Sequence, residues 1–196
     1  MNIGIMGGTF DPLHIGHKLA AEAARDSYGL DEVWFMPSYI PPHKQQAGLT
    51  GEERLELVQA AVADCGHFRI LDWEVRRGGV SYTVETARRL KETYPDHRFH
   101  FIVGADMVEY LPKWREIGEL TQLLTFIGVA RPGTELNLGA LPSGIADKVA
   151  IAEMPLIGIS STLIRERAAG GQSIRYMVPE PVYELIRRRG YYGIQP

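Results

Sequence analysis

Cysteine is almost absent from this sequence, in which Cys65 is the single one among 196 residues. One cysteine cannot form a disulfide within the chain, and neither paired cysteines nor an H-E-x-x-H segment is present to indicate a zinc site. We therefore expect no protein-held metal. We expect Cys65 to be a small buried hydrophobic residue.

An excess of positive charge and a long apolar run are also missing. The formal net charge is −3, which gives no support to non-specific nucleic-acid binding, so any anion site has to be local. The sequence contains no run of about 18 apolar residues and no leader pattern after Met1. We expect a soluble cytoplasmic protein with no membrane contact and a small-molecule partner.

What is present indicates one α/β domain over residues 1–196. The chain is 45% hydrophobic and long enough for one good core. Segments typical of strands alternate with helical patterns, which favours a mostly parallel sheet flanked by helices, with ligands at the carboxyl ends of the strands. The expected strands are 3–6, 32–36, 68–75, 98–103, 123–130 and 149–152.

The segment after the first strand is the strongest candidate for a ligand site. Gly7 and Gly8 allow backbone conformations closed to other residues and leave room for a ligand. The helix that follows presents free N–H groups to an anion. His14 and His17 are three residues apart, so they share one face beside this helix start. An ordinary strand-to-helix turn and a histidine metal site are the alternatives.

Two further segments end in polar groups that suit a nucleotide. Ser160, Ser161 and Thr162 form a hydroxyl-rich helix start, and Arg165, one turn inside, points back at any anion bound there. Asp106 follows the strand 98–103. A carboxylate there can accept hydrogen bonds from ribose hydroxyls or a base amino group, and a helix cap is the alternative.

The middle of the chain offers weaker candidates. The loop from Pro37 to Gly48 is long for a compact domain, and Lys44 in it is either functional or simply solvated. Thr50 and Glu53 predict a capping box for the next helix, and Gly29 predicts the end of the first.

Another helix is expected to begin within residues 81–86, with Ser81 and Thr83 as candidate caps. An anion held by free N–H groups at that helix start is the alternative, provided that the Glu85 side chain faces away. Trp114 lies between two basic residues, which favours an aromatic plate for a cationic ring over a core position.

Several motifs resemble a known family. The segments G-G-T-F-D-P-L-H-I-G-H (7–17) and I-S-S-T-L-I-R (159–165) resemble the two signatures of the nucleotidyltransferase superfamily. In between, P-P-H-K (41–44), S-Y-T-V-E-T (81–86), G-A-D (104–106) and Trp114 resemble the bacterial nicotinate-nucleotide adenylyltransferases. The resemblance covers nearly the whole chain.

This resemblance implies a Rossmann-like nucleotidyltransferase fold and adenylyl transfer from ATP to nicotinate mononucleotide in NAD biosynthesis, with Mg²⁺ carried on ATP. It implies catalytic roles for His17, Lys44 and Arg165. It implies ATP contacts at Gly7, Gly8, Thr9, Phe10, His14, His17, Gly104, Asp106, Ser160, Ser161, Thr162 and Arg165. It implies nicotinate-nucleotide contacts at Lys44, Thr83, Thr86, Trp114 and Arg131.

Other functions are compatible with the same two signatures. Pantetheine-phosphate adenylyltransferases and cytidylyltransferases share them, although His14 stands where the first of these would have threonine. A catalytically silent nucleotide-binding regulator is a different class, against which the presence of both His17 and Arg165 argues. Association of identical chains and the role of residues 134–147 stay open.

Overall fold

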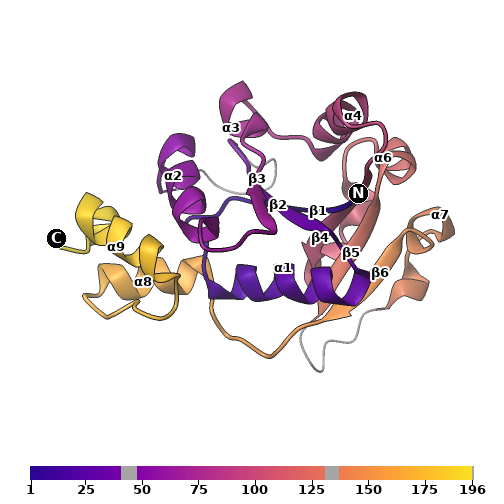
Figure 1. Ribbon diagram of the computed structural model, residues 1–196. Coiled ribbons are helices and arrows are strands. Elements are labelled where there is room, and N and C mark those ends of the chain that lie inside the picture. Colours follow the sequence, from indigo (N-terminus) through magenta and orange to yellow (C-terminus); the bar gives the residue numbers. More distant parts are fainter. Residues whose placement is uncertain (41–47, 131–136, 196) are drawn as a thin grey trace. The chain divides into compact units, whose positions relative to one another are not determined.

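The computed structural model describes residues 1–40, 48–130 and 137–195. In this part of the chain six strands form one sheet in the order β3-β2-β1-β4-β5-β6 (Figure 1). The strands are β1 (Asn2–Gly8), β2 (Glu32–Pro37), β3 (Phe68–Ile70), β4 (Arg98–Gly104), β5 (Thr125–Ala130) and β6 (Val149–Glu153). β1 pairs with β4, β4 with β5 and β5 with β6, all in parallel. The predicted parallel α/β architecture is confirmed.

The strand order reverses between β1 and β4. The chain runs from β1 to β2 and β3 on one side, and β4 returns to β1 with Met6 opposite Ile102 before β5 and β6 follow on the other side. This is the order of Rossmann-like folds, in which ligands bind outside the carboxyl ends of the strands at the reversal. Gly7 is the last residue but one of β1, and Gly104 ends β4.

The helices follow the predicted alternation. The longer ones are α1 (Ile15–Tyr28), α2 (Gly51–Val62), α4 (Thr83–Thr93), α8 (Ser161–Ala169) and α9 (Glu180–Arg189). The shorter ones are α3 (Trp73–Arg77), α5 (Ala105–Val108), α6 (Ile117–Leu123), α7 (Ser143–Ala146) and the 3-10 turns η1 (Leu111–Lys113), η2 (Leu138–Ala140) and η3 (Tyr191–Gly193). Among the helices described, none combines the length and the apolar character that crossing a membrane requires.

Local sequence signals account for two helix ends. The Thr50 hydroxyl accepts the N–H of Glu53 at 3.3 Å, and the Glu53 carboxylate accepts the N–H of Thr50 at 2.8 Å, so the predicted capping box of α2 is confirmed. Gly29 follows α1 with a φ of 58°, a left-handed conformation that favours glycine.

The predicted strand 68–75 is wrong in its second half. β3 ends at Ile70, and α3 begins after Asp72, whose carbonyl accepts the N–H of Arg76 at 3.0 Å. Val75 is only 3% exposed, but it reaches its buried position from a helix. A β-branched residue favours a strand only where a neighbouring strand is available to pair, and that information is not local in sequence.

The chain groups into two compact units. Unit 1 comprises Met1–Gly7, Ala20–Trp34 and Tyr82–Leu156, and unit 2 comprises Gly8–Leu19, Phe35–Ser81 and Ile157–Pro196. Large buried side chains of unit 1 include Ile3, Ile5, Phe101, Ile102 and Phe126. In unit 2, α2 packs against α9, and both α8 and α9 contact η3 near the yellow end of the chain (Figure 1). The expectation of a single domain stays a prediction.

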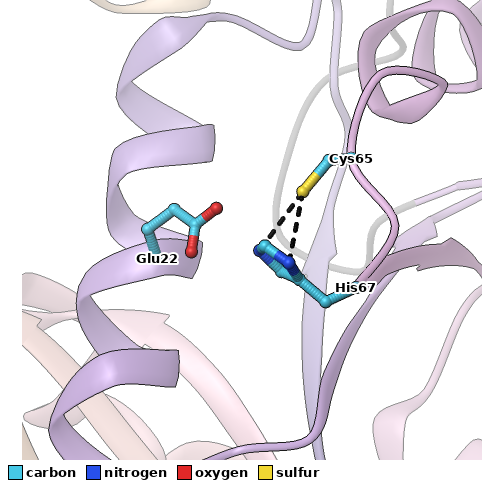
Figure 2. A group of neighbouring side chains, drawn as sticks. All are labelled: Glu22, Cys65 and His67. Atoms are coloured by element: carbon cyan, nitrogen blue, oxygen red, sulfur yellow. Dashed lines mark hydrogen bonds between the residues drawn. The ribbon is translucent and has the colours of Figure 1, made fainter.

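Cys65 is half-exposed, so its predicted burial is wrong. It lies in the turn between α2 and β3, where its N–H bonds to the Val62 carbonyl and its carbonyl accepts the N–H of Phe68. Its Sγ lies 3.2 Å from Nε2 of His67, toward which it points (Figure 2). A tight turn at the surface cannot bury a side chain as a helix face does.

Candidate functional site

The loop after β1, in unit 2, is shaped by a phenylalanine. Phe10 is 2% exposed and has a φ of 50°, a strained conformation for a residue with a side chain. A Cβ on Gly8 would lie 2.8 Å from the Phe10 ring, so glycine is needed there for close approach. The expectation that Gly7 and Gly8 adopt conformations closed to other residues is wrong, because both belong to β1 and neither has a positive φ.

The two predicted histidines lie together at the start of α1. The rings of His14 and His17 stack with centroids 3.8 Å apart, and the edge of His17 meets the Phe10 ring at 5.1 Å. The N–H of His14 donates to Nδ1 of His17 at 3.3 Å. Because Nδ1 accepts, a neutral His17 carries its proton on Nε2, so Nε2 is the donor atom of this ring.

The start of α8 is tied to the loop after β1. Ser161 Oγ donates to the carbonyl of Pro12 at 2.9 Å, and Arg165 Nη1 donates to the carbonyl of Asp11 at 2.7 Å, although 154 positions separate the last two residues. Ser160 caps α8 by accepting the N–H of Leu163 at 3.1 Å. The two sequence signatures therefore meet within unit 2.

The remaining contact of Arg165 limits how its guanidinium turns. Nη2 donates to the hydroxyl of Thr162 at 3.4 Å, and the side chain is still 36% exposed. An arginine held from behind by a carbonyl and a hydroxyl, with part of its surface open, suits contact with a phosphate.

Asp11 is a member of this group that the sequence did not single out as a site residue. Its side chain is 5% exposed. Oδ1 accepts the hydroxyl of Tyr192 at 2.7 Å, Oδ2 accepts the N–H of Gly48 at 2.8 Å, and Arg165 Nη1 lies 4.0 Å from Oδ2. One buried carboxylate thus connects the loop after β1, the segment before α2, α8 and the C-terminal turn.

Arg54 is a second such residue, only 1% exposed. Its guanidinium donates to three carbonyls: Thr9 at 2.6 Å, Tyr39 at 2.9 Å and Leu49 at 3.3 Å. Burial lowers the pKa of this guanidinium, and the charge of Asp11 opposes that effect. Arg54 therefore joins the loop after β1 to the described residues on either side of 41–47.

A sequence signal existed for Arg54 but not for Tyr192. Arg54 precedes Leu57 and Val58 by three and four positions, a spacing that places it on the buried face of α2. Tyr192 lies in η3, where no periodicity indicates which face is buried. Its partner Asp11 is 181 positions away.

In unit 1, Asp106 follows the carboxyl end of β4 and is exposed to solvent. Gly104 caps α5, and Asp106 lies exposed in the first turn of that helix without a capping bond. The cap alternative for Asp106 is therefore wrong. An exposed carboxylate at a strand end is open to hydroxyl or amino donors.

The start of α4 carries no side-chain cap in the described structure. Tyr82 occupies the cap position, so the predicted caps Ser81 and Thr83 are wrong. The Ser81 hydroxyl instead accepts the N–H of Tyr39 at 3.1 Å. Thr83 is half-buried and Thr86 is 5% exposed.

The Glu85 carboxylate, beside that helix start, pairs with Arg115. Oε1 lies 3.5 Å from Nη1 of Arg115, whose guanidinium also sits 4.4 Å above the Tyr82 ring. The positive charge of Arg115 offsets the carboxylate, which lessens the conflict between Glu85 and an anion at this helix start.

Trp114 packs partly on the sheet, and its role as an aromatic plate for a cationic ring stays a prediction. Its ring meets Phe101 of β4 and Phe126 of β5 edge to face, with centroids 5.7 Å and 6.1 Å apart. The residue is half-buried, and among described residues nothing hydrogen-bonds its buried Nε1. Lys113 and Arg115 are exposed because the chain turns there. Lys44 and Arg131 lie outside the described residues.

The sequence is similar to those of several known proteins. Residues 5–167 match a family model described as cytidylyltransferase-like. A protein of Oceanobacillus iheyensis named "Probable nicotinate-nucleotide adenylyltransferase" is 44% identical over 191 residues, 97% of this chain and 96% of its own length. A protein of the same name from Geobacillus thermodenitrificans is 48% identical over 192 residues, which cover 97% of this chain and 86% of that protein.

Solved structures extend the likeness to the fold. The Plasmodium falciparum nicotinic acid mononucleotide adenylyltransferase complexed with NaAD has a TM-score of 0.77 at 19% identity, covering 99% of this chain and 98% of that one. The same protein complexed with APC also has a TM-score of 0.77, at 18% identity. At such identities the match concerns the fold alone.

Proposed function

The chain belongs to the cytidylyltransferase-like family, and we propose that, like its nicotinate-nucleotide adenylyltransferase relatives, it transfers the adenylyl group of ATP to nicotinate mononucleotide. A phosphate oxygen of the acceptor forms a bond to the α-phosphorus of ATP. The bond from that phosphorus to the bridging oxygen breaks, and pyrophosphate leaves with the electron pair. The contact of Arg165 with the Asp11 carbonyl carries this proposal, because it joins both phosphate-binding segments.

Catalysis in this proposal consists of positioning and charge stabilisation. The acceptor phosphate is already ionised, so neither a general base nor a covalent intermediate with the protein is needed. His17 donates from Nε2, Arg165 donates from its exposed edge, and the N-terminal end of the α1 dipole adds partial positive charge. The contact of Lys44 with phosphate stays a prediction.

Mg²⁺ enters this scheme as a companion of ATP, neutralising charge on the phosphates. Among the described phosphate-binding residues of unit 2, Asp11 is the residue with a carboxylate. Each of its two oxygens already accepts a hydrogen bond. Mg²⁺ in proteins usually keeps several waters and is bound through substrate phosphates with one or two carboxylates rather than by an all-protein cage. One carboxylate among these residues is too few for such a cage, which supports delivery of Mg²⁺ on ATP.

The acceptor is the carboxylate form of the nicotinate nucleotide in this proposal. The start of α4 supports it, since N–H groups without a side-chain cap favour an ionised carboxylate over an amide, whose NH₂ would face other donors. Thr83 and Thr86 border this helix start, Trp114 stacks on the nicotinate ring, and Arg131 binds the nicotinate nucleotide. Asp106 accepts a hydrogen bond from a ribose hydroxyl of ATP. A cytoplasmic location stays a prediction.

Pyrophosphate release from ATP tests the proposal with three acceptors in turn: nicotinate mononucleotide, its amide analogue and phosphopantetheine. We expect the first to have the highest kcat/KM, by about 5- to 150-fold over the amide, because a buried donor facing a donor costs roughly 1–3 kcal/mol. Equal values for the two nucleotides would defeat the α4 argument while leaving adenylyl transfer standing. Activity with phosphopantetheine alone would reassign the enzyme, and no release with any acceptor would favour the silent regulator.

A further inference from the structure

Tyr192, near the end of the chain, is held in a conformation that tyrosine rarely adopts. It lies in η3 with a φ of 56°, in the left-handed region. Such a conformation costs free energy and persists where surrounding contacts fix it. The contact that fixes Tyr192 is the hydrogen bond from its hydroxyl to Oδ1 of Asp11, 2.7 Å long.

The Tyr192 hydroxyl is a permanent donor. Burial raises the pKa of this phenol, and the negative charge of Asp11 and the hydrogen bond to it raise it further. The phenol therefore stays protonated at every pH at which the enzyme would be assayed. Oδ1 of Asp11 has a donor at all times, and Oδ2 has the N–H of Gly48 at 2.8 Å.

Arg165 lies beside this carboxylate without forming a close ion pair with it. Nη1 is 4.0 Å from Oδ2 of Asp11 but only 2.7 Å from the carbonyl oxygen of the same residue. A guanidinium and a carboxylate that are both free prefer a two-pronged contact at shorter distance. The carboxylate is prevented from turning toward Arg165 because its oxygens are already engaged.

We propose that Tyr192 is a positioning residue for the phosphate site: by occupying Oδ1 of Asp11, its hydroxyl keeps the Arg165 guanidinium available to the phosphates of ATP. Without that hydroxyl, Oδ1 is a buried acceptor lacking a donor, and the carboxylate rotates to pair with Arg165. The phosphates then compete with Asp11 for the same guanidinium. The inference rests on the proposed function, because it takes ATP as the ligand of Arg165.

The variant Tyr192→Phe removes the hydroxyl and keeps the ring. We expect kcat/KM for ATP to fall by about 10-fold, the equivalent of one lost charge-assisted contact, while KM for nicotinate mononucleotide stays unchanged. Tyr191→Phe is the matched control, since this neighbouring hydroxyl makes no contact with Asp11 in the described structure. We expect the control to match the parent.

A double-mutant cycle separates positioning from general stability. In an Arg165→Lys background we expect Tyr192→Phe to cost less than about 2-fold, because the group that it positions is already gone. A merely structural role would cost the same in both backgrounds. Asp11→Asn, which removes the competing charge, provides a second background in which Tyr192→Phe is expected to have little effect.

Calorimetric binding of ATP to the same variants keeps this test independent of turnover. We expect the Kd for ATP to rise about 10-fold in Tyr192→Phe and to stay unchanged in Tyr191→Phe. If the parent binds ATP but releases no pyrophosphate, the proposed function fails while the binding comparison still decides the role of Tyr192. An unchanged Kd in Tyr192→Phe, or equal losses in the parent and Arg165→Lys backgrounds, would overturn the positioning role.

Discussion

Two sets of residues are built in different ways: the proposed phosphate-binding residues of unit 2 and the proposed acceptor-binding residues of unit 1. In unit 2, charged or hydroxyl side chains bond to backbone carbonyls far away in sequence, as Arg54 does to Thr9 and Arg165 to Asp11. In unit 1, Trp114 packs its ring against two phenylalanines, and the described start of α4 carries no side-chain cap. The first group is held by polar bonds, and the second relies on ring packing and open backbone donors.

This difference corresponds to what each group has to do. Stabilising charge during transfer requires donors already fixed in place before the substrate arrives, because reorienting them costs free energy at the moment of reaction. Choosing between a carboxylate and an amide requires only donors that cannot become acceptors, and backbone N–H groups meet that requirement. Mutations of the proposed phosphate-binding residues in unit 2 should therefore change ATP binding or turnover, whereas mutations at the start of α4 in unit 1 should change the preference for the acceptor.

The largest effect is expected for His17→Ala. Loss of a donor aimed at charge that develops in the transition state lowers kcat by on the order of 100-fold or more, with much less effect on ATP binding. The control is His67→Ala, which should keep the parental kcat. His67 is a half-exposed histidine of unit 2 that is not among the proposed phosphate-binding residues. Steady-state kinetics measure both, and a kcat within a few-fold of the parent would remove His17 from the mechanism.

Arg54→Met should cost stability as well as activity. Three carbonyls lose their donor in a buried place, so the free energy of unfolding is expected to fall by about 3 kcal/mol. Urea denaturation measures this loss, and Arg69→Met at an exposed arginine of β3 should change it much less. A loss no greater than that of Arg69→Met would mean that Arg54 does not hold the loop after β1.

The sequence predicted those parts of the molecule that depend on local patterns. Alternating strands and helices gave the parallel sheet, and Thr50 with Glu53 gave a helix start that the structure reproduces. The segment that begins at Gly7 and the helix start at Ser160 pointed to phosphate binding because small residues, hydroxyls and helix N-termini have this chemistry wherever they occur.

Features that depend on distant partners were missed. Asp11 was not identified as a site residue because its partner Tyr192 lies 181 positions away. The polar neighbours Lys113 and Arg115 argued against a core position for Trp114, whereas its ring contacts strands β4 and β5. Ser81 looked like a helix cap because nothing near it in sequence reveals that its hydroxyl accepts from Tyr39. A hydrogen bond or ring contact between distant segments leaves no period for a single sequence to show.

Arg165→Lys should be less costly than His17→Ala but still clear. An ammonium reproduces the charge but not the planar two-pronged contact, so kcat/KM for ATP is expected to fall by on the order of 30-fold. Arg167→Lys is the matched control on the same helix, since that guanidinium donates to the Ser173 carbonyl instead. If Arg165→Lys turns over like the control, Arg165 supplies only a general positive charge.

The smallest effect is expected for Glu85→Gln, and it tests whether the acceptor carboxylate really meets the start of α4. Glu85 and Arg115 have side chains 35% and 51% exposed, so their ion pair contributes at most about 1 kcal/mol and its loss should leave folding nearly unchanged. Removing the negative charge lessens repulsion of an incoming carboxylate, while Arg115 keeps its ion pair with Glu116 at 3.2 Å, so KM for nicotinate mononucleotide should fall about 2- to 3-fold. The amide analogue carries no charge at that position, so its KM should not change.

Glu92→Gln, at an exposed position in the last turn of the same helix, controls for net charge and should alter neither value. Equal changes in KM for both acceptors would show that the effect is not electrostatic recognition of the carboxylate. The proposed difference between the two units, with polar side-chain bonds in unit 2 and backbone N–H donors in unit 1, would then be wrong.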